Sequence, residues 1–516
     1  MELKELTEKV NKIFDVSSTA ELSDKLHSIC LNNETEYFDS FVNLVKDLSV
    51  DWLQKIFQYY EADRKEKMQD YTPISLAKFV GRLTRHTDEK TVYDLCAGSG
   101  ALTIQKWDQN NDLQFVCYEF DKNVIPFLLF NLAVRNIEAT VINGDALQDN
   151  VFKTYSIHKS NKYSAVSEIE KSNKIECNSC ISNPPYNMKW ELPPLAQMQE
   201  RFSGYQLPPE SNANYAFMLT AINSVNQNGK VSMILPCGVL STDNKQEKEI
   251  RKYLIKKNTI ESVITCPDKM FEATSIPTCI LTFNKSKETA HITFVDMRQT
   301  YEIEQRKQNG QFGGASHEGR TYKKDVKVIS NEQMQKVADC IANRTDIAEF
   351  SKTVSIQDVI ENDCDLIPSK YIEFGEKEVS HREYADIIGD VNRVIADKNV
   401  LKLTMNETIA KSIGIYDLFL LFKQSEETNG AMNDALKFTG KQIEKENFIS
   451  LSKNKNEIKF ENNSKEQIST IFMSIMQMWK QHVMYLNNEE NRYLIELRDA
   501  LLPDLMSGKI DLDVHQ

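Results

Sequence analysis

The segment Asn183-Pro184-Pro185-Tyr186 has residue types that together predict chemistry on an amino group. Consecutive prolines hold the backbone extended and have no amide hydrogen, so the Asn183 side chain and the Pro184 carbonyl can both act as acceptors. An exocyclic amine has two hydrogens that match two such acceptors. Tyr186 adds an aromatic face on which a base can stack. These four residues are therefore predicted to be catalytic.

A glycine-rich turn lies upstream of this segment and predicts a cofactor site. The apolar residues 91–93 lead into Asp94-Leu-Cys-Ala97-Gly98-Ser99-Gly100, and a helical pattern follows. A strand, such a turn and a helix bring backbone amides close to a nucleotide-like ligand. About twenty residues later Glu119 ends the next predicted strand, where a carboxylate can accept from both ribose hydroxyls. The pair predicts an adenosine-containing cofactor, and the absence of G-x-G-x-x-G disfavours a nicotinamide dinucleotide.

A third predicted strand, residues 139–142, ends in Asn143-Gly144-Asp145-Ala146. In this type of fold the end of that strand borders the base of the cofactor, so Asp145 can accept from an adenine amino group. Such a sequence is often only a turn. The place of Asp145 and Ala146 in the strand order is what makes them candidate cofactor residues.

The elements that must position these motifs form an α/β pattern. Short apolar runs alternate with helical segments from about residue 70 to 300, which predicts a doubly wound, Rossmann-like sheet. We expect an N-terminal helical domain, a cofactor-binding catalytic domain, a mainly helical C-terminal region and a helical, coiled-coil-like tail. Their predicted bounds are 1–68, 69–340, 341–463 and 464–516.

The tail predicts one long amphipathic helix over residues 464–502. Apolar or aromatic residues follow a heptad-like seam, namely Ile468, Ile471, Ile475, Met478, His482 and Tyr485. Such a seam requires a partner helix on this chain, on a second copy or on another protein. Pro503 and Gly508 are expected to end the helix.

Composition limits the classes of protein that fit. The chain has 516 residues, of which 41% are hydrophobic and 27% charged, as expected for a folded protein of two or three domains. No apolar run approaches about 20 residues, so we expect a cytoplasmic protein without a membrane partner. The net charge of −13 disfavours binding of nucleic acid over the whole surface, so any DNA contact must be local or shared with a partner. Two basic runs, residues 248–257 and 320–327, are candidates.

Ten cysteines are scattered along the chain, a pattern that favours reduced thiols. Cys177 and Cys180 form the single C-x-x-C, and they precede an apolar strand. No second C-x-x-C stands at zinc-finger spacing, so we expect strand residues and no metal site.

Together these motifs resemble DNA amino-methyltransferases, specifically the modification (M) subunits of type I restriction-modification systems, over roughly residues 68–375. The family's N-P-P-Y/F is similar to Asn183–Tyr186, its D-x-x-x-G-x-G to Asp94–Gly100 and its ribose acid to Glu119. Tyr71-Thr72-Pro73 resembles a Y-T-P segment that packs over the methionine end of the cofactor. Four later segments also resemble M subunits: 213–217, 229–240, 276–281 and 365–371.

The resemblance implies S-adenosyl-L-methionine as cofactor and N6 of an adenine flipped out of double-stranded DNA as acceptor, with Asn183 also bordering the cofactor. A cofactor motif that precedes the catalytic motif is typical of the N6-adenine branch. Methylation of N4 of cytosine, of a protein glutamine amide or of RNA stays open, as does a non-catalytic assembly role. The implied partners are a specificity (S) subunit and a restriction or translocase subunit.

Two features depart from the M-subunit pattern. The helical region before Tyr71 is shorter than is usual, which puts a role in subunit contact or base-pair opening in doubt. Residues 489–511 closely resemble the end of the spacer helices of S subunits. We therefore expect the tail to pair with a shortened specificity protein, while a homodimer through the tail and a fold back onto its own core remain alternatives.

Overall fold

The computed structural model describes residues 3–60, 72–170, 175–271, 276–309, 321–374, 381–412, 449–454, 457–462 and 470–506. These residues belong to two compact units. The first comprises residues 1–311 and 318–375, and the second comprises residues 312–317 and 376–516.

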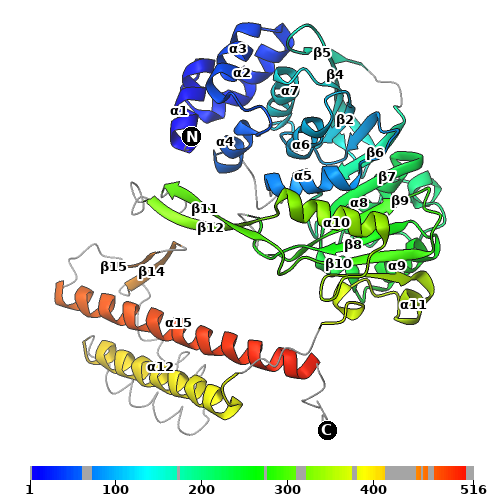
Figure 1. The fold of residues 1–516 in the computed structure, drawn as a ribbon. Coiled ribbons are helices and arrows are strands. Elements are labelled where there is room, and N and C mark those ends of the chain that lie inside the picture. Colours follow the sequence, from blue (N-terminus) through cyan, green and yellow to red (C-terminus); the bar gives the residue numbers. More distant parts are fainter. Residues whose placement is uncertain are drawn as a thin grey trace. The chain divides into compact units, whose positions relative to one another are not determined.

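A mixed sheet of 11 strands forms the centre of the first unit, in the order β13-β10-β8-β9-β7-β6-β1-β2-β3-β4-β5 (Figure 1). The five neighbouring strands β7, β6, β1, β2 and β3 are parallel. Strands β4, β5, β9 and β13 pair antiparallel with their neighbours. The strand bounds are β1 Thr91–Asp94, β2 Gln114–Glu119, β3 Glu138–Asp145, β4 Asn150–His158, β5 Ala165–Ile169, β6 Cys177–Ser182, β7 Val225–Pro236, β8 Ile260–Thr265, β9 Thr278–Asn284, β10 His291–Asp296 and β13 Ser351–Ser355.

Crossover helices connect the parallel strands and confirm the predicted doubly wound α/β fold. From β1 the chain runs to β2 and β3 on one side, and from β6 it runs to β7 on the other. The strand order therefore reverses between β1 and β6, and this is the point at which ligands bind in open sheets of this kind. The helices of the unit that follow α4 are α5 Ile74–Leu83, α6 Ala101–Gln109, α7 Ile125–Val134, α8 Asn214–Asn223, α9 Lys245–Lys256, α10 Asn331–Asn343 and α11 Ile356–Glu361.

Four N-terminal helices pack against α7 rather than forming a separate core. They are α1 Leu3–Phe14, α2 Thr19–Asn32, α3 Thr35–Val45 and α4 Trp52–Tyr60. The Phe130 ring of α7 meets Phe14, Phe38 and Phe41 edge-on at centroid distances of 5.2, 5.2 and 5.1 Å. Edge-to-face aromatic pairs of this kind add to the stabilisation from apolar burial. The predicted helical region thus shares its core with the sheet layer.

A two-stranded ribbon, β11 Glu302–Asn309 and β12 Thr321–Val328, forms a sheet of its own in the first unit. Figure 1 shows it projecting away from the main sheet. No helix among the described residues is long and apolar enough to cross a membrane.

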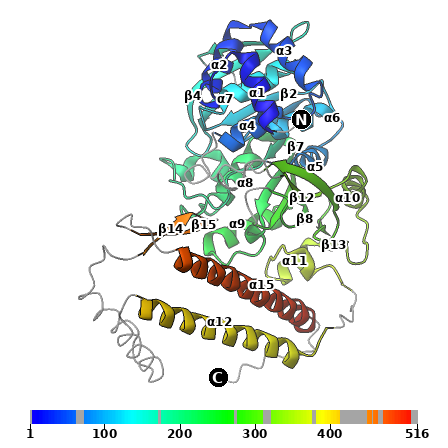
Figure 2. The same ribbon diagram turned by 90° about the vertical axis from the view of Figure 1, so that its left-hand side faces the viewer.

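The second unit contains two long helices, α12 Tyr384–Ser412 and α15 Thr470–Met506, and a hairpin of β14 Ile449–Asn454 and β15 Glu457–Asn462. The helices lie side by side in Figure 1 and Figure 2. They are antiparallel, because Tyr384 donates to the Ala500 carbonyl at 3.4 Å whereas Lys398, further along α12, pairs with Glu490.

The tail differs from its prediction in two respects. Among the described side chains of α15, the buried ones recur every seventh position, at Leu486, Tyr493 and Ala500, whereas His482 and Tyr485 are exposed. The seam is displaced by one residue because α12 packs on the neighbouring stripe of the helix. Pro503 was expected to end the helix, but α15 continues through it to Met506. The predicted seam residue Ile468 and the predicted helix-ending residue Gly508 lie outside the described residues, and the side chains of Ile471, Ile475 and Met478 do as well.

Candidate functional site

The two predicted motifs meet at the carboxyl ends of adjacent strands. β1 and β6 are parallel neighbours with Asp94 opposite Ile181, and the Leu95 amide donates to the Ile181 carbonyl at 3.3 Å. The glycine-rich turn follows β1 and the Asn183 segment follows β6. The structure therefore places the predicted cofactor turn and the predicted catalytic segment together at the strand-order reversal.

The glycines of the turn have conformations that side chains rarely adopt. Gly98 has φ +56° and Gly100 has φ +101°, and a Cβ on Gly100 would lie 3.0 Å from Leu128 Cδ1. The Gly98 amide donates to Glu119 Oε2 at 2.8 Å, which fastens the turn to the end of β2. Helix α6 begins directly after Gly100, so its N-terminus faces the same region.

Two carboxyls border this turn, that of the buried Asp94 and that of the half-buried Glu119. Burial raises the pKa of Asp94 to about 7, and the charge of Glu119 adds to the effect. Asp94 Oδ2 accepts from the Thr103 hydroxyl at 2.7 Å, and Oδ1 has no hydrogen-bond partner among the described residues. Burial also raises the pKa of Glu119 to about 7, although the Gly98 and Asp121 amides donate to it. A cationic ligand with hydroxyl donors fits this pair of carboxyls.

The end of β2 also presents an aromatic ring that the sequence motifs did not single out. Phe120 directly follows Glu119 and is 55% exposed. Asn143 Nδ2 donates to the carbonyls of Glu119 and Phe120 at 3.0 Å each, so the end of β3 holds this segment in place. The signal that could have identified Phe120 is an aromatic residue directly after a candidate ribose acid.

The predicted adenine contacts, Asp145 and Ala146, have other partners in the structure. Asp145 Oδ1 accepts from the amides of Leu147 and Gln148 at 2.9 and 3.1 Å, as in a turn. The Ala146 carbonyl accepts from Arg201 at 2.7 Å. Both residues lie at the end of β3, beside β2.

In the catalytic segment the Asn183 side chain is held by hydrogen bonds on both sides of its amide. Its Nδ2 donates to Thr72 Oγ1 at 2.9 Å, and its Oδ1 accepts from the Tyr186 hydroxyl at 2.6 Å. Thr72 was predicted to contact the cofactor, and in this structure it orients the Asn183 amide. The Tyr186 ring meets the Phe271 ring edge-on at a centroid distance of 6.2 Å.

The remaining members of the two proline-containing segments have mainly backbone roles. Pro184 is buried and Pro185 is half-buried. The Pro73 carbonyl accepts from the Ala77 amide at 2.9 Å and starts α5. Tyr71 lies outside the described residues.

A buried polar network joins the N-terminal helices to the cofactor turn. Asp51, at the start of α4, accepts from the Ser99 hydroxyl at 2.6 Å and from Asn131 Nδ2 at 2.9 Å. Asn131 also donates to the Ser99 carbonyl at 2.9 Å. Arg135 donates to the carbonyls of Leu48 and Val50 at 2.7 and 2.9 Å. The turn is thus supported by residues from a region that the sequence did not connect with it.

The basic run of α9 is largely occupied by contacts within the chain. Arg251 is buried and donates to the carbonyls of Cys364 and Thr242. Lys248 pairs with Asp363, and Lys257 lies over the Tyr253 ring at 4.9 Å. This run therefore serves mainly to hold the fold together.

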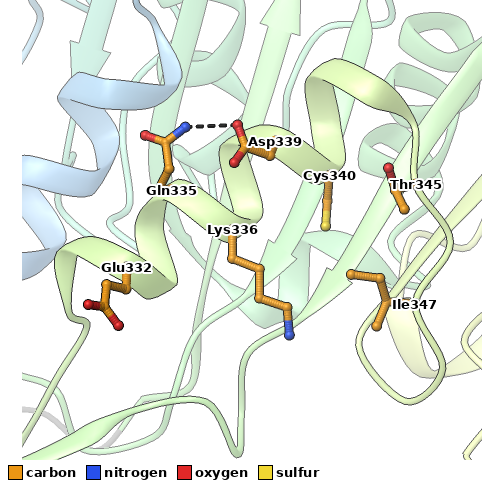
Figure 3. Close-up of a pocket in the computed structure, with 7 residues that line it drawn as sticks. All are labelled: Glu332, Gln335, Lys336, Asp339, Cys340, Thr345 and Ile347. Carbon is orange, nitrogen blue, oxygen red and sulfur yellow. Dashed lines mark hydrogen bonds between the residues drawn. The ribbon is translucent and has the colours of Figure 1, made fainter.

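A surface hollow of about 510 Å³ lies beside α10, away from the predicted site residues (Figure 3). Gln335 donates to Asp339 at 2.8 Å, and the Lys336 ammonium lies over the Phe350 ring at 3.9 Å. None of the predicted site residues lines it. Cys177 and Cys180 are buried strand residues without a disulfide, and no metal-binding group of three or more His, Cys, Asp or Glu occurs in the described part of the chain.

The fold is shared with a methyltransferase subunit of a type I restriction-modification system from Streptococcus thermophilus. The two structures align with a TM-score of 0.52 at 21% identity, over 72% of this chain and 80% of that one. The family model described as N-6 DNA Methylase matches residues 45–380. The chain therefore belongs to the N-6 DNA methylase family.

Two curated relatives are methylase subunits of type I restriction enzymes. MpnII of Mycoplasma pneumoniae is 24% identical over 365 residues, which are 68% of this chain and 61% of the relative. HindI of Haemophilus influenzae is 24% identical over 386 residues, which are 70% of this chain and 78% of the relative. The chain thus spans less than two thirds of the length of the first relative.

Proposed function

We propose that the protein is an S-adenosyl-L-methionine-dependent DNA methyltransferase that modifies N6 of adenine, as the modification subunit of a type I or type I-like system. The observation that carries this proposal is the junction of the cofactor turn and the Asn183-Pro184-Pro185-Tyr186 segment at adjacent strand ends. Membership of the N-6 DNA methylase family supports the reaction, the cofactor and the acceptor atom.

The Asn183 amide and the Pro184 carbonyl are the acceptors that hold the target amine. Because Thr72 accepts from Asn183 Nδ2, the amide orientation is set, with Oδ1 on the side of Tyr186. The target amine takes the place of the Tyr186 hydroxyl at Oδ1. Two acceptors draw both amino hydrogens and increase electron density on the nitrogen, so catalysis rests on positioning and electrostatics. The released Tyr186 ring stacks on the flipped base.

The cofactor site consists of the turn Asp94–Gly100, Glu119 and Phe120. When bound, S-adenosyl-L-methionine supplies an electrophilic methyl group on a sulfonium centre. Ionised Glu119 accepts from the ribose hydroxyls, and the exposed Phe120 ring offers a stacking face for the adenine. When ionised, the buried Asp94 carboxyl adds negative charge that suits a positively charged ligand. Asp145 is proposed to border the adenine with the carboxylate oxygen that does not bind the turn.

The helix pair α12 and α15 is proposed to bind a specificity subunit. The relatives are subunits of restriction enzymes, and residues 489–511 resemble the spacer end of specificity proteins. Among the apolar side chains that α12 does not cover and that stay exposed on α15 are Met484, Ile495 and Leu502, which form one stripe. We propose that this exposed stripe contacts the partner, which brings the recognition of the DNA site.

The test is single-molecule sequencing of modified bases in cells that express the protein with its neighbouring genes. N6-methyladenine at one recurring site is expected. Asn183→Ala should lose methylation because one acceptor is gone, whereas calorimetry should show nearly wild-type cofactor affinity. Methylated cytosine would contradict the assigned base, and wild-type turnover of Asn183→Ala would contradict the catalytic role.

A further inference from the structure

The β11–β12 ribbon carries an uneven distribution of charge. Its inner half, residues 302–305 and 325–328, contains three acidic residues and one lysine, whereas all four charged residues of its outer half, residues 306–309 and 321–324, are cations. The outer cations are Arg306, Lys307, Lys323 and Lys324. In a chain with a net charge of −13, such a local concentration of positive charge predicts an anionic ligand.

The backbone register places these cations opposite one another. Arg306 stands opposite Lys324, and Lys307 stands opposite Lys323. Like charges at directly opposed positions destabilise a strand pair, and a two-stranded ribbon is only marginally stable by itself. An anion bound along the outer half would relieve this repulsion, so the register favours a ligand with repeated negative charges.

The base of the ribbon is fastened to a segment that also contacts the catalytic residues. Lys327 of β12 pairs with Asp268, and its ammonium lies 4.1 Å from the centre of the Tyr301 ring. Asp268 belongs to the segment that follows β8 and leads to Phe271, whose ring contacts Tyr186. The ribbon is thus fastened to the segment whose Phe271 contacts the residue proposed to stack on the target base.

We infer that the β11–β12 ribbon is a DNA-binding arm, whose four outer cations contact the phosphates of the duplex that carries the target base. This inference rests on the proposed function and identifies where an acidic chain contacts its anionic substrate. Each strand of eight residues spans about 26 Å, and a two-stranded ribbon fits the major groove. Contacts of this kind position the duplex without reading its sequence.

The test compares two full-length variants that lose the same charge. In the ribbon variant Arg306, Lys307, Lys323 and Lys324 become Gln. In the control variant Gln replaces four exposed lysines elsewhere in the first unit, Lys4, Lys12, Lys90 and Lys245. Fluorescence anisotropy with a labelled duplex at several NaCl concentrations gives the dependence of affinity on salt, and calorimetry with S-adenosyl-L-methionine reports whether each variant is folded.

The ribbon variant should bind the duplex at least about tenfold more weakly at 0.1 M salt. The slope of the logarithm of its binding constant against the logarithm of the salt concentration should be smaller in magnitude by about 3 to 4. The control should bind like the wild type, and both should retain cofactor affinity. Equal losses in the two variants, a wild-type slope in the ribbon variant or no duplex binding by the wild type at low salt would overturn the inference. A ribbon that binds DNA in a protein that transfers no methyl group would instead contradict the proposed function alone.

Discussion

At the scale of single residues, the protonation of Glu119 links the cofactor site to pH. Glu119 is half-buried, and this loss of solvent raises the pKa of its carboxyl to about 7. The unfolded chain has an ordinary glutamate pKa near about 4.3, so between these values the folded protein binds a proton that the unfolded chain releases. Stability of the free protein therefore falls as pH rises through this range.

Cofactor affinity is expected to have the opposite dependence on pH. Only ionised Glu119 accepts from both ribose hydroxyls, so the affinity for S-adenosyl-L-methionine should weaken as pH falls through about 7. Glu119→Gln should bind more weakly at pH 8 and show a flatter profile between pH 6 and 8. Calorimetry across this range tests the expectation. A steep wild-type profile that persists in Glu119→Gln would assign the titration to another group, with Asp94 as the next candidate.

At the scale of elements, the glycine turn between β1 and α6 depends on a backbone conformation rather than on a side chain. Gly98→Val should abolish measurable cofactor binding, because φ is +56° and a β-branched side chain is strained there. Gly238→Ala is the matched control, since a Cβ there meets nothing within 4 Å. Calorimetry and thermal unfolding should show that Gly238→Ala binds the cofactor and unfolds like the wild type. Unchanged affinity in a folded Gly98→Val would move the cofactor to another site.

The sheet and its two motifs could be predicted from the sequence because their signals are local. Short apolar runs predict the strands. The residues at the carboxyl ends of these strands, such as Asp94, Glu119 and Asn183, follow those runs directly. Parallel strands then bring these ends to one edge of the sheet. The predicted fold and family were confirmed on this basis.

Contacts between distant segments could not be predicted in the same way. Asp51 and Ser99 are 48 positions apart, and Thr72 and Asn183 are 111 apart, yet each pair forms a hydrogen bond. No periodic pattern encodes such a pair, because a hydroxyl or carboxylate has many partners within reach. The same reason explains the shifted seam of the tail, where the position of α12 decides that Leu486 rather than Tyr485 is buried.

At the scale of the whole molecule, the two units are proposed to have different roles, the first in cofactor binding and catalysis and the second in binding a partner. The first unit encloses the proposed site, and its N-terminal helices support the cofactor turn through Asp51. In the described part of the second unit, a small core cluster consists of Val391, Val394, Leu486 and Tyr493. Small helical units of this size usually gain stability from a partner.

The last prediction concerns that partner. On α15 the exposed residues Met484, Ile495 and Leu502 recur at intervals that place them on one stripe, opposite the seam that faces α12. A helix with two apolar stripes requires a second neighbour. Removal of residues 464–516 should therefore abolish binding of the specificity partner and site-specific methylation, while cofactor binding persists.

A point variant separates loss of the partner from loss of the helix pair, because truncation also uncovers α12. Ile495→Asp should weaken co-purification with the specificity protein at least about tenfold, since it places a charge within an apolar contact. Asn487→Asp adds the same charge at another exposed position of α15 and should behave like the wild type. Circular dichroism should show equal helix content in both variants. If Ile495→Asp and the truncated chain still co-purify with that partner and methylate the same sites, the tail is not the docking element.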